Sequence, residues 1–170
     1  MENELVIKCK KGDKEAFSLL VEQYYNQMFL LSLSILKNPY DASDACQEGF
    51  LTAYKKIKNL RDNDRFKSWL SKIIWNCSKD LYMKNKKRPQ PQEYLDLGDY
   101  YSEDTLKNAD VFHYIMQLKD EYRQVLILRY FHDLKLKEIA KITGRPVSTV
   151  KSRLRYALNA MKGLMENEYE

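Results

Sequence analysis

Glycine and proline, the residues that break helices and build tight turns, are scarce in this chain. It holds only 5 glycines and 4 prolines in 170 residues, which is too few for a protein made of many short strands and turns. Strand-like alternation is also hard to find, whereas apolar residues recur at helical spacing along most of the sequence. We therefore expect an all-α protein.

Clustered metal ligands and catalytic groups are missing as well. Cys9, Cys46 and Cys77 are far apart and form no CxxC pair, which argues against a zinc site or a disulfide framework and fits a reducing compartment. His113 and His132 belong to no sequence pattern typical of metal ligands or of a nucleophile with its base, and no pair of carboxylates stands out. We therefore expect no metal, no cofactor and no catalytic residue, and we predict that the protein is not an enzyme.

No apolar run is long enough to span a membrane, which takes roughly 20 residues. The most apolar stretch, MFLLSLSIL at 28–36, predicts the buried middle of a helix, and the charged start MENELVIKCKKGDKEAF does not resemble a signal peptide. We expect a cytoplasmic protein with no membrane insertion of its own. Its net charge of +5 suits an anionic partner but does not prove one.

The helical spacing predicts two small helical domains joined by a flexible linker. Residues 88–105, RPQPQEYLDLGDYYSEDT, combine prolines with acids and show no helical stripe, so they are predicted to form the linker. Helical patterning fills the N-terminal domain, 1–87, and returns in the C-terminal domain, 106–170. In the first domain we expect Asp13 to cap the second helix, and Asp41 or Ser43 to cap the third.

The second domain contains the stretch LKEIAKITGRPVSTVKSRLRYALNAMK, which predicts a helix-turn-helix. Gly144 supplies the turn, and Pro146 fits the first turn of the following helix, where its missing N–H costs nothing. The small Ala140 allows the two helices to approach closely. A buried stripe is predicted on the second helix, with Val147 near it: Val150, Leu154, Ala157, Leu158 and Met161.

The opposite face of that second helix combines short polar side chains with basic ones and carries no acid. This mixture reads base edges and grips phosphates when a helix enters the major groove of DNA. The alternative is an ordinary basic, solvated helix in an αα-hairpin. The candidate duplex-DNA residues are Ser148, Thr149, Lys151, Ser152 and Arg155.

The last helix of the first domain carries an aromatic residue among lysines. Trp75 points away from the apolar stripe that begins at Phe66, and Lys72, Lys79 and, at the edge, Asn76 surround it. An exposed tryptophan beside phosphate-binding charges suits stacking on unpaired bases. The alternative is that Trp75 packs under the linker or the other domain.

The preceding helix predicts a third surface, which is acidic. Its buried stripe is expected to consist of Cys46, Phe50, Ala53, Tyr54 and Ile57. Asp44 and Glu48 project outward with Gln47 and Leu51 beside them, and an acidic face in a basic protein indicates docking to a protein more than to DNA. The alternative is a solvated acidic first turn favoured by the helix dipole.

Together these stretches resemble extracytoplasmic-function (ECF) sigma factors. The segments GDKEAFSLLVEQYY, DASDACQEGFLTAYKKI and FKSWLSKIIWNCSKDLY resemble the first domain of that family. The segment YRQVLILRYFHDLKLKEIAKITGRPVSTVKSRLRYAL resembles the second domain. The blocks follow one another at the expected separations over nearly the whole chain, so the resemblance is specific, and it also accounts for the two-domain layout.

The resemblance implies a transcription initiation factor that binds core RNA polymerase, directs it to promoters and helps to open the DNA. The second domain would read the −35 element as duplex through the five residues named above. The first domain would read the −10 element on the exposed non-template strand, where Leu60, Arg61 and Asn76 match the place at which the family holds a flipped base.

The resemblance also assigns partners to the protein. Asp44, Gln47, Glu48 and Leu51 match the block that docks on the polymerase clamp. The family is commonly held inactive by an anti-sigma factor, often one anchored in the membrane, which would hold the protein at the inner membrane face. The alternative function is a free-standing helix-turn-helix regulator, which needs no acidic docking face and usually dimerises on a palindromic site.

Overall fold

The computed structural model describes residues 1–86 and 109–167, and every regular element within them is helical, which confirms the all-α prediction. The chain divides into two compact units, Met1–Gln90 and Pro91–Glu170. The linker predicted at 88–105 lies outside the described residues.

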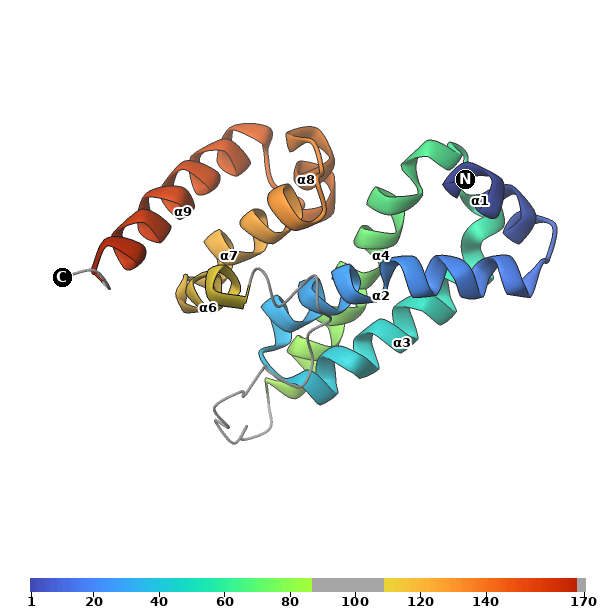
Figure 1. Ribbon diagram of the computed structural model, residues 1–170, viewed down its shortest axis with the longest axis horizontal. Helices are drawn as coiled ribbons and strands as arrows, with labels where there is room; N and C mark the ends of the chain where they lie inside the picture. The colour runs from blue at the N-terminus through green and yellow to red at the C-terminus, as the bar shows by residue number, and fades with distance from the viewer. Residues whose placement is uncertain (87–108, 168–170) are drawn as a thin grey trace. The chain divides into compact units, whose positions relative to one another are not determined.

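In the first unit, the second helix, α2, packs against all of the other α-helices (Figure 1). Its apolar middle is buried as expected, with Met28, Leu31 and Leu33 fully enclosed. The elements of this unit are α1 (Glu2–Lys10), α2 (Lys14–Leu36), α3 (Pro39–Lys56), the 3₁₀ turns η1 (Ile57–Asn59) and η2 (Asn63–Arg65), and α4 (Phe66–Asn85).

The helix ends in this unit follow from their capping residues. Asp13 caps α2 as predicted, because its side chain accepts a hydrogen bond from the Ala16 N–H at 3.0 Å. The prediction that Asp41 or Ser43 caps α3 is wrong. Asn38 caps it by accepting from the N–H groups of Tyr40 and Asp41 at 2.9 and 3.1 Å, and Pro39 occupies the first helical position, which tolerates its missing N–H.

Helices α3 and α4 approach each other closely at Gly49. A Cβ atom placed there would lie 2.3 Å from Cδ1 of Ile74, so a side chain at position 49 would force Ile74 to move. The predicted stripe of α3 is buried except for Tyr54, which is 36 % exposed. Its ring rests edge-on against Phe17 at a centroid distance of 5.0 Å, so Tyr54 lies at the border of the core.

The second unit contains α6 (Ala109–Gln117), α7 (Asp120–Leu126), the π turn η4 (Ile127–Phe131), α8 (Leu136–Thr143) and α9 (Val147–Asn167). Arg123 is fully buried and fastens the turn between α6 and α7. Its guanidinium donates to the Leu118 carbonyl at 2.8 Å and to Asp120 Oδ1 at 2.6 Å. Burial lowers the pKa of Arg123, and Asp120 opposes that effect.

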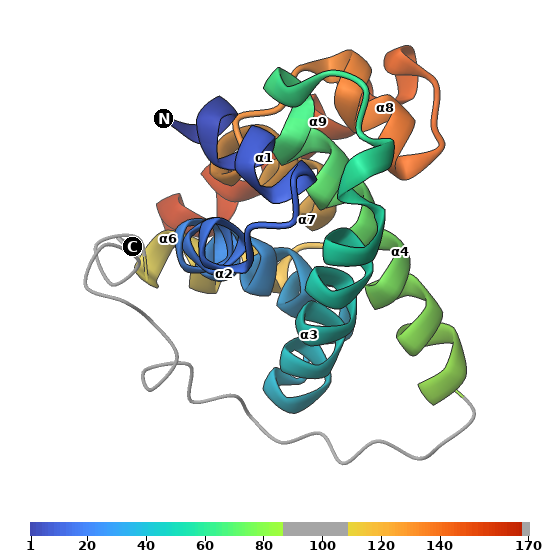
Figure 2. The same ribbon diagram turned by 90° about the vertical axis from the view of Figure 1, so that its right-hand side faces the viewer.

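Helices α8 and α9 form the predicted helix-turn-helix (Figure 2). Gly144 has φ +66°, a left-handed conformation that favours glycine, and ends α8. Four of the predicted core positions of α9 are buried: Val150, Leu154, Ala157 and Met161. The prediction is wrong for Leu158, which is 46 % exposed because it lines an open apolar cavity.

Candidate nucleic-acid and protein interfaces

The outer face of α9 brings together all five residues predicted to read duplex DNA. Ser148, Lys151 and Arg155 are exposed, whereas Thr149 and Ser152 are half-buried. The Ser152 hydroxyl donates within its own helix, to the carbonyls of Ser148 and Thr149, both at 3.1 Å. Its lone pairs therefore remain to accept a hydrogen bond from a partner.

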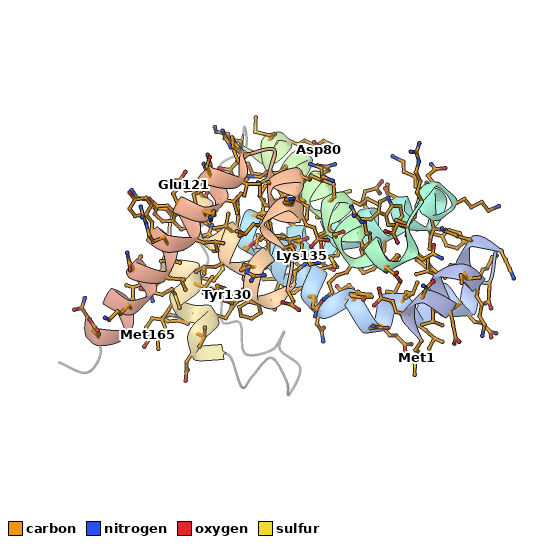
Figure 3. The ribbon with its side chains drawn as sticks, turned by 90° about the horizontal axis from the view of Figure 1, so that it is seen from above. Met1, Asp80, Glu121, Tyr130, Lys135 and Met165 are labelled. Carbon is orange, nitrogen blue, oxygen red and sulfur yellow. The ribbon has the colours of Figure 1, made fainter. Side chains whose placement is uncertain are left out.

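Of the four basic residues of α9, Arg153 braces the helix, Lys162 pairs with Glu166 at 3.8 Å near its end, and the other two are left for a partner. Arg153 is only 20 % exposed and forms an ion pair with Glu121 of α7 at 3.1 Å (Glu121 is labelled in Figure 3). Lys151 and Arg155 are exposed, and the Arg155 guanidinium lies 5.3 Å from the centroid of the Tyr156 ring. Such a cation–π contact holds the guanidinium at the surface without neutralising its charge.

The acidic face of α3 is free of the core, as the sequence predicted. Asp44, Gln47 and Glu48 are exposed, and Leu51 is 54 % exposed beside them. A single exposed leucine is common on protein surfaces, and here it adds apolar area beside the acids.

A groove of about 650 Å³ runs between α3 and α4 along this acidic face. Its lining includes Asp44, Glu48 and Asp80, and Asn76 lies in it as well. Burial raises the pKa of the Cys77 thiol at its wall, and the charges of Glu48 and Asp80 raise it further against the opposing effect of Lys56. The effect of the two acids on the pKa of Cys77 is thus larger than that of the lysine. Asn76 lies in the groove beside the acidic face and is also next to Trp75 in the sequence.

The face of α4 around Trp75 differs from its prediction in one respect. Lys72 and Lys79 are half-buried, and the Lys79 ammonium lies 4.9 Å from the centre of the Trp75 ring. The aromatic–lysine pairing is therefore present. The Trp75 ring, however, is only 7 % exposed, whereas the helical spacing predicted an exposed ring. Spacing along one helix gives the direction of a side chain but not its burial.

The turn between α3 and α4 exposes one of its two predicted residues. Arg61 is exposed, whereas Leu60 is 6 % exposed and contributes its side chain to the core. Leu60 therefore offers a partner little beyond its backbone. The structure thus narrows the candidate contact in this turn to Arg61.

One surface was not predicted from the sequence, namely an apolar cavity of about 720 Å³ in the second unit. Helix α9 provides Leu158, Met161 and Met165, and the π turn provides Tyr130 (Met165 and Tyr130 are labelled in Figure 3). The signal was present in the sequence, because Leu158 lies within the apolar stripe of α9 and Met165 continues that stripe past the buried Met161.

The described residues contain neither a cluster of metal ligands nor a membrane-spanning helix. Within 1–86 and 109–167, no three His, Cys, Asp or Glu side chains are placed to hold a metal ion. Among the helices of those ranges, none combines the length and apolarity that crossing a bilayer needs. Burial raises the pKa of Cys46 to about 12, so this thiol stays neutral in the core at physiological pH.

Both units match known protein families. Residues 20–88 match the family described as Sigma-70 region 2, and residues 110–161 match the family described as Sigma-70, region 4. The first match contains α3 and α4 with the turn between them, and the second contains the helix-turn-helix.

Curated relatives extend the likeness over nearly the full chain. RNA polymerase sigma factor SigV of Bacillus subtilis is 34 % identical over 92 % of this chain and 95 % of its own length. The ECF RNA polymerase sigma factor SigW of the same organism is 33 % identical over 90 % of each chain. The ECF RNA polymerase sigma-E factor of Escherichia coli is 30 % identical over 92 % of this chain and 90 % of its own.

Solved structures share the fold. CnrH, solved in complex with the cytosolic domain of CnrY, aligns with a TM-score of 0.68 at 23 % identity over 98 % of this chain and 97 % of its own. The sigma factor RpoE of Bartonella quintana, solved with the anti-sigma factor NepR, aligns with a TM-score of 0.66 at 19 % identity over 88 % of this chain and 96 % of its own.

Proposed function

Because this chain belongs to the extracytoplasmic-function family of RNA polymerase sigma factors, we propose that its exposed surfaces divide the recognition steps of transcription initiation among them. As a sigma factor, the protein binds core RNA polymerase, directs the enzyme to promoter DNA and promotes initiation. In this proposal the polymerase catalyses RNA synthesis, and we assign no catalytic step to this chain.

The observation that carries the proposal is the division of charge between two exposed helix faces. From residue 147 to residue 165, α9 contains four basic residues and no acid. On α3, in contrast, Asp44 and Glu48 are exposed. The basic face of α9 attracts phosphates, whereas the acidic face of α3 repels them. A protein that binds only DNA would therefore gain nothing from the acidic face.

We assign α9 to the −35 element as duplex DNA. Its exposed Lys151 and Arg155 lie one turn apart, and helix α8, which is joined to α9 at Gly144, braces it. In this arrangement Arg155 and Ser152 are suited to base edges, and Lys151 to a phosphate.

We assign the α3–α4 turn and the Trp75 face to the −10 element as a single strand. Arg61 supplies an exposed guanidinium, and Asn76 supplies an amide that can both donate to and accept from a base edge. Leu60 supports the turn by packing its side chain into the core. Lys72 and Lys79 follow the backbone, and Trp75 stacks on a base once its ring is uncovered.

We assign the acidic face of α3 to the polymerase clamp. Asp44 and Glu48 would meet basic side chains, Gln47 would add hydrogen bonds, and the exposed Leu51 would supply apolar contact. This pairing of charge with an apolar anchor suits a specific protein interface.

A gel shift with duplex promoter DNA tests the sigma-factor assignment against the free-standing regulator. We expect the protein alone to bind the duplex weakly, and the complex with core polymerase to bind it tightly. Tight, sequence-specific binding by the protein alone, unchanged by polymerase, would favour the regulator. The salt dependence of each shift reports how many phosphate contacts each form makes.

We further propose that an anti-sigma factor controls this protein in the cytoplasm, at the inner membrane face if that partner is membrane-anchored. The support is the likeness of fold to CnrH and RpoE, which were solved with CnrY and with the anti-sigma factor NepR. The apolar cavity beside α9 is a suitable place for an apolar helix of such a partner. Loss of inhibition on replacing Leu158 and Met165 with Glu would support this assignment.

A further inference from the structure

Helix α1 lies against the turn that connects α3 to α4, and Figure 1 and Figure 2 show the two side by side. This helix precedes the stretch that matches the Sigma-70 region 2 family, which begins at residue 20. The turn that it contacts contains Arg61, the residue to which we assign single-strand reading.

Lys10 makes the central contact between α1 and this turn. Its Nζ atom donates to the Leu60 carbonyl oxygen and to Asn63 Oδ1, both at 2.5 Å. The side chain of Lys10 is half-buried, so water competes with these bonds less than it would at the open surface. One ammonium therefore bonds to the turn on both sides of Arg61, through the backbone of Leu60 and through the side chain of Asn63.

Asn3, two turns earlier on α1, adds a second contact to the same turn. Its amide nitrogen donates to Asp64 Oδ1 at 2.9 Å, and its amide oxygen accepts from Asn63 Nδ2 at 3.1 Å. Asn63 is thus bonded to both Lys10 and Asn3.

Helix α1 is itself firmly anchored, so it can serve as a rigid support. Val6 and Cys9 are buried, and the Glu2 carboxylate accepts a hydrogen bond from the Tyr24 hydroxyl. Burial has the largest effect on the pKa of Tyr24 and raises it, and the contact with Glu2 raises it further. The hydroxyl therefore stays protonated and acts as the donor. The Tyr24 ring in turn packs on Phe66, the first residue of α4, at a centroid distance of 5.6 Å.

The turn also has a local framework that keeps its far end in place. The Asp62 carboxylate accepts from the Asp64 N–H at 3.1 Å and pairs with Arg65 Nε at 3.2 Å. Arg61 is therefore held between two fixed points, Leu60 on one side and Asp62 on the other, and its side chain is exposed.

We propose that Lys10 and Asn3 are positioning residues, which hold the turn in the conformation in which Arg61 reads a base of the single-stranded −10 element. The inference rests on the proposed function of the turn. Lys10 acts through the backbone of Leu60 and the side chain of Asn63, without touching DNA itself. A reading group that is held in place discriminates between bases better than one that first has to be ordered.

The experiment compares holoenzymes that contain the full-length protein or its Lys10→Met variant. Each holoenzyme selects from single-stranded oligonucleotides with a randomised −10 element, and sequencing gives the base preference at every position. We expect Lys10→Met to lower the preference at one position, or two adjacent ones, by about tenfold, which lies within the range for one lost base contact. Preference at the −35 duplex and affinity for core polymerase should be unchanged.

Three further variants make the result specific. Lys8→Met removes the same charge from the exposed face of the same helix and should leave every preference unchanged. Lys10→Arg keeps a cationic donor and should retain most of the selectivity. Asn3→Ala should lower preference at the same position as Lys10→Met by a smaller factor, and it serves as the test if Lys10→Met fails to fold.

The outcomes separate this inference from the proposed function on which it rests. If Arg61→Ala removes a base preference that Lys10→Met and Asn3→Ala leave intact, the positioning role is wrong and the reading role of the turn stands. If Arg61→Ala changes no preference either, the reading role fails and the inference fails with it. A uniform loss of affinity for all bases in Lys10→Met would also overturn the positioning role.

Discussion

The exposed faces of α3 and α9 are built in the same way and carry opposite charge. Each helix gives one stripe to its own core, which includes Phe50 in α3 and Leu154 in α9. Each leaves the other side exposed, with Glu48 on the first helix and Lys151 on the second. The fold alone does not distinguish their partners; the chemistry of the exposed face does.

The largest effect should come from reversing the charge of α3. Exposed charges away from the core change the free energy of unfolding by no more than about 0.5 kcal/mol, but truncating one of a pair of opposed charges at an interface costs about 2–5 kcal/mol. Asp44→Arg with Glu48→Arg should therefore abolish co-purification with core polymerase at an unchanged melting temperature. Glu4→Arg with Glu22→Arg, the same charge change at exposed sites elsewhere in the unit, is the control. Full polymerase binding by the folded double variant would contradict the docking assignment.

The corresponding change on α9 should leave polymerase binding intact and remove promoter selectivity. We expect Lys151→Ala, Ser152→Ala and Arg155→Ala together to abolish discrimination at the −35 element, since each lost base contact costs about 1–3 kcal/mol. Binding of the holoenzyme to duplexes with altered −35 sequences measures the effect, with Lys162→Ala as a control at an exposed position near the end of α9. Retention of −35 selectivity by the triple variant would remove α9 from the reading role.

A smaller effect is expected at Trp75, which we assign to single-stranded DNA and not to the duplex. Stacking on a base is worth about 1–3 kcal/mol, and it acts only after the strands separate. Trp75→Ala should therefore slow promoter opening more than it weakens the closed complex, as permanganate reactivity of unpaired thymines would show. Thymine reactivity equal to that of the wild type would mean that the buried ring serves packing instead.

The smallest effect should follow from loss of the brace between α7 and α9. The Arg153–Glu121 pair is partly exposed, at 20 % and 47 % for the two side chains, and such pairs contribute at most about 1 kcal/mol. Glu121→Ala should lower the melting temperature slightly and leave −35 selectivity in place, as thermal denaturation and the duplex assay above would show. A loss of selectivity as large as that of the α9 triple variant would mean that the angle of α9 depends on this pair.

Local sequence patterns were sufficient for the all-α character, for the helix-turn-helix and for the exposure of two of the three predicted surfaces. Asp13 and Gly144 mark helix ends through chemistry that acts within four residues. The exposed acids of α3 and bases of α9 follow from helical spacing alone, because a helix that buries one stripe leaves the opposite side free.

Features that depend on contacts between distant segments could not be predicted in this way. Lys10 and Leu60 meet across fifty positions of the sequence, and no periodicity indicates such a pair. The burial of Leu60 and Trp75 depends on which other groups lie against them. The exposure of Leu158 likewise depends on the shape of the cavity that it lines.

Run-off transcription with purified core polymerase tests the central claim most directly, namely that the acidic face of α3 makes this protein a sigma factor. The wild-type protein should support a transcript from a promoter that core polymerase alone does not use. The folded Asp44→Arg, Glu48→Arg variant should support none, although its α9 is unchanged. A transcript of wild-type yield with this variant would contradict the account.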